Sequence, residues 1–109
     1  MKSVGRMVPA LFMVLVVIFL FAGDAAAGKD LFARKCASCH GAAGEGKDSV
    51  AKTFKVELHH LGSKEVQGKS DADLQKMILE GTGKMKAVKD LDAKGADDIV
   101  AYMRTLAKK

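Results

Sequence analysis

The segment Cys36-Ala-Ser-Cys-His40 contains both cysteines of this 109-residue chain and places a histidine directly after them. Side chains this close in sequence act on a single local partner or on each other. Four chemistries use such a segment: a disulfide, a redox dithiol, a metal or cofactor site, and a phosphate-binding loop, because three glycines and Lys47 follow. The rest of the chain has to decide among them.

The first 27 residues are predicted to be a secretory signal peptide. They begin with positive charge, continue as an almost unbroken apolar run over residues 7–22, and end with three alanines at 25–27. This order of a charged start, an apolar middle and small residues is typical of a leader that is removed during export.

A retained membrane anchor is the alternative to a cleaved leader. A spanning helix needs about 20 apolar residues, whereas this run is shorter and has Pro9 near its start. We therefore expect cleavage after Ala27, a single domain over residues 28–109, and no stable membrane insertion once the leader is gone. The location is predicted to be periplasmic or otherwise exported.

A domain over residues 28–109 is small and buries too little apolar surface to be comfortably stable by side chains alone. It has two phenylalanines, one tyrosine and no tryptophan. Domains of this kind commonly recruit a disulfide, a metal or a cofactor. We expect something other than side chains to occupy part of the core.

The charge pattern indicates a solvated surface. The whole chain carries a formal net charge of +5, with acids interleaved among the lysines. A more specific interpretation is that the lysines steer the protein toward an acidic partner. Nucleic acid is not an expected partner, because an exported chain without a basic stripe has no use for it.

Three helices and no strands are predicted from apolar spacing. They run from about Lys29 into the cysteine motif and end near Gly41, from 71 to 80, and from 93 to the C-terminal lysines. Ser70 and Asp92 are the expected N-caps of the second and third, and Gly81 the stop of the second. The loop over 41–69 is unusually long for a small domain unless it wraps something.

Two of the four chemistries fit poorly. The segment from Gly41 to Asp48 follows the phosphate-loop pattern except at its end, where Asp48 replaces the hydroxyl that binds Mg²⁺, and no strand precedes it. A redox dithiol needs its cysteines at the start of a helix in a βαβ unit, whereas these lie at a helix end. A zinc site could use the motif, but only His59 or His60 is left to complete four ligands.

Covalent haem attachment is the remaining interpretation, because Cys-x-x-Cys-His is its spacing. Cys36 and Cys39 would each form a thioether with one vinyl group of the porphyrin. His40, the next residue, would be the proximal ligand of the iron. The predicted cofactor is therefore one covalently bound haem c.

With this motif, residues 28–109 resemble the small, single-haem class I c-type cytochromes of bacterial periplasmic electron transport. Gly28 and Phe32, ahead of the motif, are similar to the family's N-terminal helix. Ile99 and Tyr102 are similar to the C-terminal helix that crosses it. The resemblance implies an all-α fold of three to four helices wrapped around one covalently attached haem.

The resemblance also implies a second axial ligand. The Gly-Lys-Met of residues 83–85 is similar to the loop that presents the family's methionine, which makes that ligand Met85. An unbranched thioether on a glycine-flanked loop can also approach iron from the face opposite His40. Met77 and Met103 lie on helix stripes, where core packing explains them better.

Two features depart from the family's pattern, because residues 28–109 contain no proline and Lys86 follows Met85. The hydrogen-bond acceptor for the proximal histidine is therefore open, and a backbone carbonyl within residues 58–62 is a hypothesis. The stiffness of the methionine loop is open as well.

The leading interpretation is an exported one-electron carrier with His40 and Met85 as iron ligands, which is not an enzyme and shuttles electrons between redox partner proteins. The partners would have acidic docking surfaces. One alternative is a haem protein with a labile sixth ligand that acts as a peroxidase or ligand sensor. Others are a bis-histidine cytochrome that uses His59 or His60, and a module stabilised by zinc or a disulfide.

Overall fold

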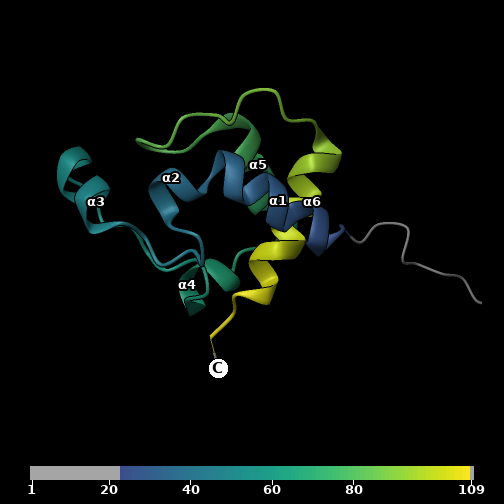
Figure 1. Ribbon diagram of the computed structural model, residues 1–109, viewed down its shortest axis with the longest axis horizontal. Coiled ribbons are helices and arrows are strands. Elements are labelled where there is room, and N and C mark those ends of the chain that lie inside the picture. The colour runs from purple at the N-terminus through teal and green to yellow at the C-terminus, as the bar shows by residue number, and fades with distance from the viewer. Residues whose placement is uncertain (1–22, 109) are drawn as a thin grey trace, which may run out of the picture.

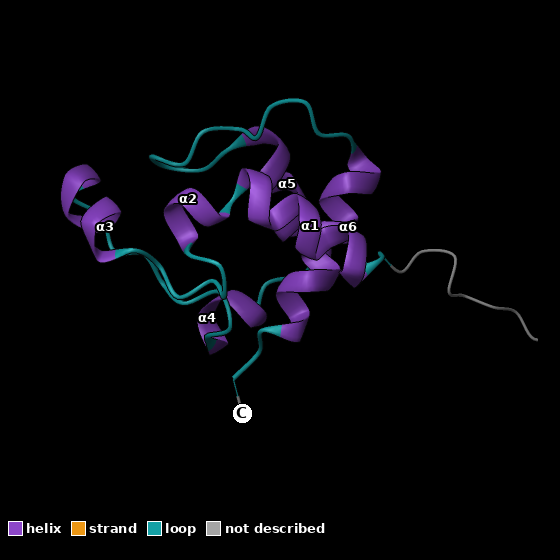
Figure 2. Ribbon diagram, in the orientation of Figure 1, coloured by secondary structure: helices purple, strands orange, loops and turns teal. Residues whose placement is uncertain are grey.

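The computed structural model describes residues 23–108. Residues 1–22 of the predicted 27-residue leader lie outside this range, whereas residues 25–27 form the start of the first helix. The described part is helical and contains no named strand, which confirms the predicted all-α class (Figure 2). The helices are α1 (Ala25–Lys35), α2 (Ala37–His40), α3 (Asp48–Phe54), α4 (Lys64–Gln67), α5 (Asp71–Glu80) and α6 (Ala93–Thr105). No helix between residues 23 and 108 is long and apolar enough to cross a bilayer.

Helices α1 and α6 cross near the centre of the molecule (Figure 1). Gly28 allows the close approach, since a Cβ at this position would collide with the backbone carbonyl oxygen of Asp98. One turn further along α1, the buried ring of Phe32 lies 5.3 Å from the ring of Tyr102, at an interplanar angle of 59°. Gly28, Phe32 and Tyr102 thus form the crossing that the resemblance implied.

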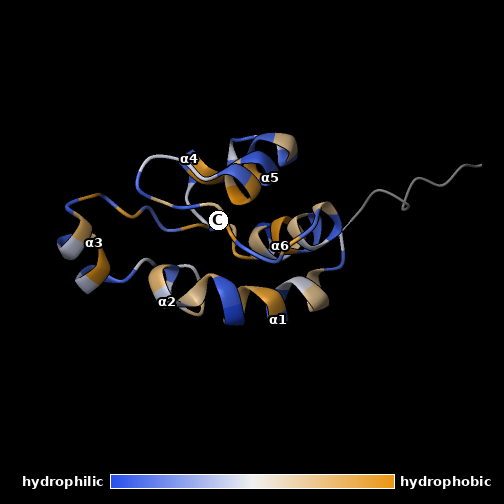
Figure 3. Cartoon of the chain, turned by 90° about the horizontal axis from the view of Figure 1, so that it is seen from above, coloured by the Kyte–Doolittle hydropathy of each residue, from blue (hydrophilic) through white to orange (hydrophobic). Residues whose placement is uncertain are grey.

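The core is small and lies along α6, which runs between α1 and α5 (Figure 3). Its buried apolar residues are Phe32, Cys36, Leu61, Val66, Leu74, Ile78, Ala96, Ile99, Val100 and Met103. The largest side chains that are completely buried are Phe32 and Ile99. The core is therefore thin, as the composition predicted.

The two well-marked helices begin and end where the sequence predicted. The hydroxyl of Ser70 accepts a hydrogen bond from the Asp73 N–H at 3.0 Å and caps α5. The carboxylate of Asp92 accepts from the Gly95 N–H at 2.8 Å and caps α6. Gly81 follows α5 with a φ of 84°, a backbone conformation that favours glycine.

The first helix differs from the prediction at both ends. It begins at Ala25, ahead of the predicted start near Lys29, because the carboxylate of Asp24 accepts from the N–H groups of Ala26 and Ala27. It also breaks at Cys36, and the chain resumes helix as α2 before Gly41.

Two short helices, α3 and α4, lie within the segment predicted as a loop over 41–69 and take up 11 of its 29 residues. α3 has no side-chain N-cap and ends at Lys55, which adopts a left-handed φ of 55°. α4 has only four residues and is capped by Ser63. α3 stands apart from the other labelled helices in two perpendicular views (Figures 1 and 3).

Candidate functional site

Cys36, Cys39 and His40 lie at the junction of α1 and α2. The N–H groups of Cys39 and His40 both donate to the carbonyl of Cys36, at 3.2 and 3.0 Å. Residues three and four apart in such a turn share one face. The short helix α2 therefore gathers the three motif residues on one side of the chain.

Both cysteines are free thiols. Burial raises the pKa of the Cys36 thiol to about 11, against the smaller opposing effect of the Lys35 charge. A redox dithiol works with a thiol pKa lowered toward neutrality. The environment of Cys36 has the opposite effect, so the thiol–disulfide interpretation loses support.

Met85 lies on the loop between α5 and α6, in a tight turn that begins at Thr82. Thr82 and Met85 exchange two backbone hydrogen bonds of 2.9 Å each, and Gly83 between them has a φ of 56°. At Gly81 a Cβ would lie 2.7 Å from the carbonyl oxygen of Met85. Backbone hydrogen bonds and glycines thus shape this loop, which has no proline.

Two cavities meet at three of the four predicted site residues. The larger, of about 400 Å³, is lined by the α1–α2 junction, α3 with the residues after it, and the methionine loop. The smaller, of about 100 Å³, reaches into the core between α5 and α6. Cys36, His40 and Met85 line both cavities, and Cys39 lines the larger one.

The larger cavity has a volume within the range of roughly 300–1,000 Å³ that is usual for small-molecule and cofactor sites. A further depression of about 460 Å³ lies over Leu31, Leu91 and Gly95, and it contains none of the predicted site residues. The site is therefore assigned to the two cavities that share the motif histidine.

One wall of the larger cavity was missed by sequence reasoning. It consists of the apolar side chains of Val50, Phe54, Val56 and Leu58. Val50 and Phe54 are four residues apart on α3 and share a helix face. This spacing was the available signal, but the helix is too short and too weakly capped to stand out.

His40 has a buried ring nitrogen without a hydrogen-bond partner. Its Nδ1 atom is buried and has no hydrogen-bond partner within the described residues. Burial lowers the pKa of His40, which favours the neutral imidazole, the form that can bind a metal. The hypothesis that a carbonyl within residues 58–62 accepts from His40 Nδ1 finds no hydrogen bond in the described part of the chain.

The other two histidines lie outside both cavity linings. His59 Nε2 is 3.3 Å from Glu65 Oε2, and His60 Nδ1 accepts from the Gly62 N–H at 2.8 Å. Within residues 23–108, no group of three or more His, Cys, Asp or Glu side chains could hold a metal ion. Because His59 and His60 have other partners, both the zinc site and the bis-histidine site lose support.

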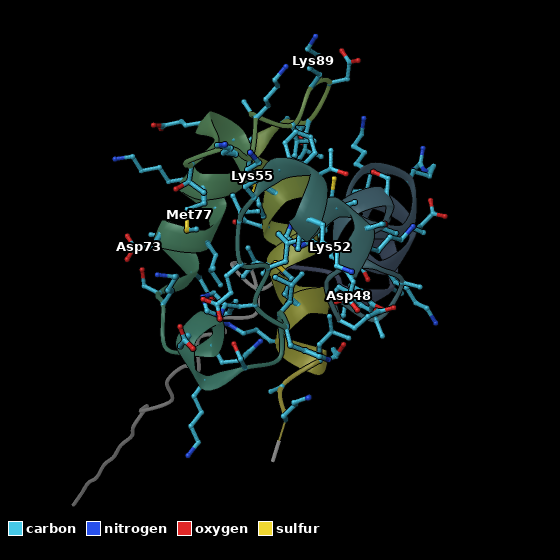
Figure 4. All side chains as sticks on the ribbon, turned by 90° about the vertical axis from the view of Figure 1, so that its left-hand side faces the viewer. Asp48, Lys52, Lys55, Asp73, Met77 and Lys89 are labelled. Atoms are coloured by element: carbon cyan, nitrogen blue, oxygen red, sulfur yellow. The ribbon has the colours of Figure 1, made fainter. Side chains whose placement is uncertain are left out.

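Lysines form part of the lining of the larger cavity. Lys35, Lys84 and Lys86 are among its lining residues. Figure 4 looks onto the side of the molecule that carries α3, and Lys52 and Lys55 are labelled there. The charged side chains that line this apolar cavity are therefore all positive, while Asp48 and Asp73 are labelled with Lys52 and Lys55 on the same side of the molecule.

Two of these lysines link separate segments of the chain. Lys84 Nζ donates to the carbonyl of Phe54 at 3.1 Å, which joins the methionine loop to α3. Lys35 Nζ donates to the carbonyl of Lys89 at 3.1 Å, which joins α1 to the same loop. Both walls of the cavity are thereby held to the methionine loop.

The donor set and its surroundings fit a covalently attached iron porphyrin. Two free thiols, a neutral imidazole with an unpartnered buried nitrogen and a thioether line one apolar space. Thiols can form thioethers with a porphyrin, and imidazole and thioether are its common axial ligands. The residues present could therefore hold a haem.

Comparisons with known proteins agree with this chemistry. The family model described as "Cytochrome C oxidase, cbb3-type, subunit III" matches residues 23–103. The curated cytochrome c-554(547) of Halothiobacillus neapolitanus is 36% identical over 91 residues, which cover 78% of this chain and 99% of that protein.

Solved structures are similar as well. The KustC0563 c-type cytochrome is 25% identical with a TM-score of 0.64, and the match covers 74% of this chain and 98% of that one. The sulfane dehydrogenase SoxCD from Paracoccus pantotrophus contains a chain that is 26% identical with a TM-score of 0.53. That match covers 77% of this chain and 43% of the SoxCD chain.

Proposed function

Because the chain belongs to the c-type cytochrome family of the cbb3-type subunit III model, we propose that it is an exported one-electron carrier with His40 and Met85 as axial ligands. Membership makes it a small class I c-type cytochrome, a haem-containing electron-transfer protein with covalently bound haem c. The ligand pair, a single haem, export and a role outside catalysis are the proposal.

Cys36 and Cys39 are proposed to anchor the haem through thioethers, with His40 as the proximal ligand of the iron. All three are on one face of the α1–α2 junction, and neither thiol is in a disulfide. The unpartnered Nδ1 of His40 remains available to a water or a backbone acceptor in the holoprotein.

The observation that carries the ligand pair is that His40 and Met85, together with Cys36, line both cavities. Met77 and Met103 line the smaller cavity only. Met85 lies where the two cavities meet, so a cofactor that fills both cavities would contact it. Met85 is therefore the best-supported sixth ligand among these methionines.

When bound, the haem supplies an iron that changes between Fe(II) and Fe(III) by one electron. With His40 and Met85 both as ligands, the coordination of the iron would be complete and no position would be open to a substrate. The apolar cavity wall excludes water, which favours the less charged oxidation state. The hydrogen bonds at Thr82, Lys84 and Lys35 hold the ligand loop in one geometry during the change.

The proposed partners are redox proteins with acidic docking surfaces, because Lys35, Lys84 and Lys86 line the larger cavity and would attract them. The proposed export is supported by the signal-peptide layout of residues 1–27.

The test is a spectrum and a redox titration of the holoprotein purified from a periplasmic extract. We expect a haem stain that survives denaturing electrophoresis, one haem per chain by mass, and a Met-to-iron charge-transfer band in the oxidised protein. A colourless protein would rule out covalent haem. A coloured protein without that band, which reacts with peroxide or small ligands, would favour the peroxidase or sensor alternative.

A further inference from the structure

Residues 23–27, which the predicted cleavage would remove, belong to the folded domain. Asp24 caps α1, because its Oδ1 accepts from the N–H groups of Ala26 and Ala27 at 2.9 and 3.2 Å. The N–H of Asp24 itself donates to Oδ1 of Asp98 on α6 at 2.8 Å. This bond ties the first turn of α1 to the other end of the chain.

The hydrogen bond from Asp24 satisfies a buried carboxylate. Asp98 is only 4% exposed, and within residues 23–108 it is the one charged residue that is buried. Burying a carboxylate is costly unless it is paired and hydrogen-bonded. Its second partner, Lys94 Nζ at 3.0 Å, belongs to a side chain that is 76% exposed, so solvent weakens that interaction. Cleavage after Ala27 would remove the Asp24 N–H and leave Asp98 with Lys94 alone.

The contact with α6 reaches back to Gly23. A Cβ at this position would collide with the carbonyl oxygen of Asp97, so the backbone of residue 23 lies directly against α6. The match to the family model also begins at residue 23. The folded unit and the family resemblance therefore share one N-terminal boundary.

We propose that the leader is removed by hydrolysis of the Ala22–Gly23 peptide bond, ahead of the cut that the alanines at 25–27 predict. A leader peptidase of the export machinery adds one water, so that Ala22 keeps the new carboxylate and Gly23 the new α-ammonium. Ala22 is a small residue directly before the cut, while Leu20 occupies the other small-residue position of the A-x-A pattern, so the proposal rests on the contacts of Gly23 and Asp24. The mature chain then keeps Asp24 as the cap of α1 and the partner of Asp98.

This inference rests on the proposed export, and the two can fail separately. The full chain is expressed with haem-attachment machinery, and the periplasmic holoprotein is analysed by intact mass and N-terminal sequencing. We expect the sequence to begin Gly-Asp-Ala-Ala-Ala. A periplasmic holoprotein that begins at any other residue overturns the inference alone, and a haem protein that stays in the cytoplasm with its leader overturns both.

A matched pair of variants identifies the cut independently. Ala22→Gln should abolish the Gly23 start, because glutamine is too large for the position before the cut. Ala27→Gln should leave the Gly23 start unchanged, because Ala27 does not lie next to the proposed cut. The variant should also fold, since glutamine is well tolerated in a helix. The reverse pattern would overturn the inference.

The role of the retained residues is tested by deleting 23–27, so that Ala22 precedes Gly28. The holoprotein should melt roughly 4–8 °C lower, a shift typical for the loss of one cap in a domain of this size. Ala26→Ser, an exposed change in the same turn, is the control and should melt close to the parent. Equal melting of the deletion variant and the parent would overturn the inference.

Discussion

At the scale of single residues, Met85 has a role that truncation can isolate. Met85→Ala should leave the haem attached but remove the thioether from the iron, because both cysteines and His40 are unchanged. A soft ligand stabilises Fe(II), so the midpoint potential should fall by roughly 0.1 V or more within the ~0.8 V span that axial ligands set. Redox titration and the charge-transfer band of the oxidised protein measure the change.

Met77 provides the matched control, since it is partly buried against the core and lines only the smaller cavity. Met77→Leu conserves volume and should leave both the potential and the band unchanged. If Met77→Leu removed the band and Met85→Ala did not, the ligand would be Met77.

Asp98 makes stability depend on acid pH. The Asp24 backbone N–H, with help from Lys94, lowers the pKa of Asp98 against the cost of burial. A folded pKa below the unfolded value of roughly 3.9 means that this contribution is present above that value and is lost as pH falls through the folded pKa. Asp98→Asn should therefore lower the melting temperature at pH 7 by roughly 4–8 °C, the effect of about 1 kcal/mol.

The difference between Asp98→Asn and the parent should narrow as the pH falls below about 4. Thermal melts of the holoprotein across this range measure it. Asp97→Asn changes the net charge equally at an exposed neighbouring position and serves as the control. A gap between Asp98→Asn and the parent that stays constant with pH would contradict the linkage.

At the scale of elements, the junction between α5 and the methionine loop depends on Gly81. Its φ of 84° and ψ of 167° lie in a region that is essentially restricted to glycine, and a Cβ there would approach the Met85 carbonyl. Gly81→Ala should cost about 1–3 kcal/mol and should shift the ligand loop. Melting temperature and the intensity of the charge-transfer band measure the two effects.

Gly83 in the same turn is the control, because nothing lies within 4 Å of a Cβ there and a side chain would add only the backbone strain of its left-handed φ of 56°. Gly83→Ala should cost about 1–2 kcal/mol and leave the band in place, because it brings no collision with the Met85 carbonyl. Equal losses in the two variants would show that the loop, rather than this junction, is the sensitive part.

The elements that the sequence predicted well are those with local signals. Ser70 and Asp92 cap α5 and α6 in the structure as their positions indicated, and Gly81 ends α5. The predicted start of α1 near Lys29 was wrong, because the alanines after Asp24 fit two patterns, the end of a leader and the first turn of a helix. α3 was missed because its apolar residues line a cavity instead of completing a helical stripe against the core.

The candidate site shows the same division. Cys36, Cys39 and His40 could be predicted from spacing alone, because a short helical turn gathers neighbours in sequence. The choice of Met85 rested on the family resemblance and on its glycine-flanked loop, since spacing does not show which methionine reaches the cavity. The cavity wall at Val50 and Phe54 depends on how distant segments meet, which neither spacing nor composition encodes.

At the scale of the whole molecule, the cofactor should hold α3 in place. The extensive helix contacts of the described chain join α1 with α6, α5 with α6, and α1 with α2, whereas α3 lines the larger cavity. A variant with Cys36→Ala and Cys39→Ala should therefore lose protection from hydrogen exchange in α3 before it loses protection in α6. Equal loss in both helices would mean that the fold collapses as one unit.

The lysines that line the larger cavity should bias electron exchange with small reagents. Oxidation by the hexacyanoferrate(III) anion should slow several-fold as salt rises from about 0.01 to 0.15 M, because screening weakens the attraction. Oxidation by a cationic cobalt(III) complex should accelerate over the same range. Lys84→Gln should reduce both salt effects, and a flat response in the parent would leave the lysines as a solvated surface only.

The order of the site residues along the chain also sets an order of assembly. The cysteines and His40 precede Met85, and the Lys84–Phe54 bond forms only when the late loop meets α3. If the chain is exported from its N-terminus, as proposed, the attachment thiols emerge before the segment that carries Met85, the proposed sixth ligand. Haem attachment would then precede the docking of the methionine loop on α3, and the Lys84–Phe54 hydrogen bond would form only after the haem is in place.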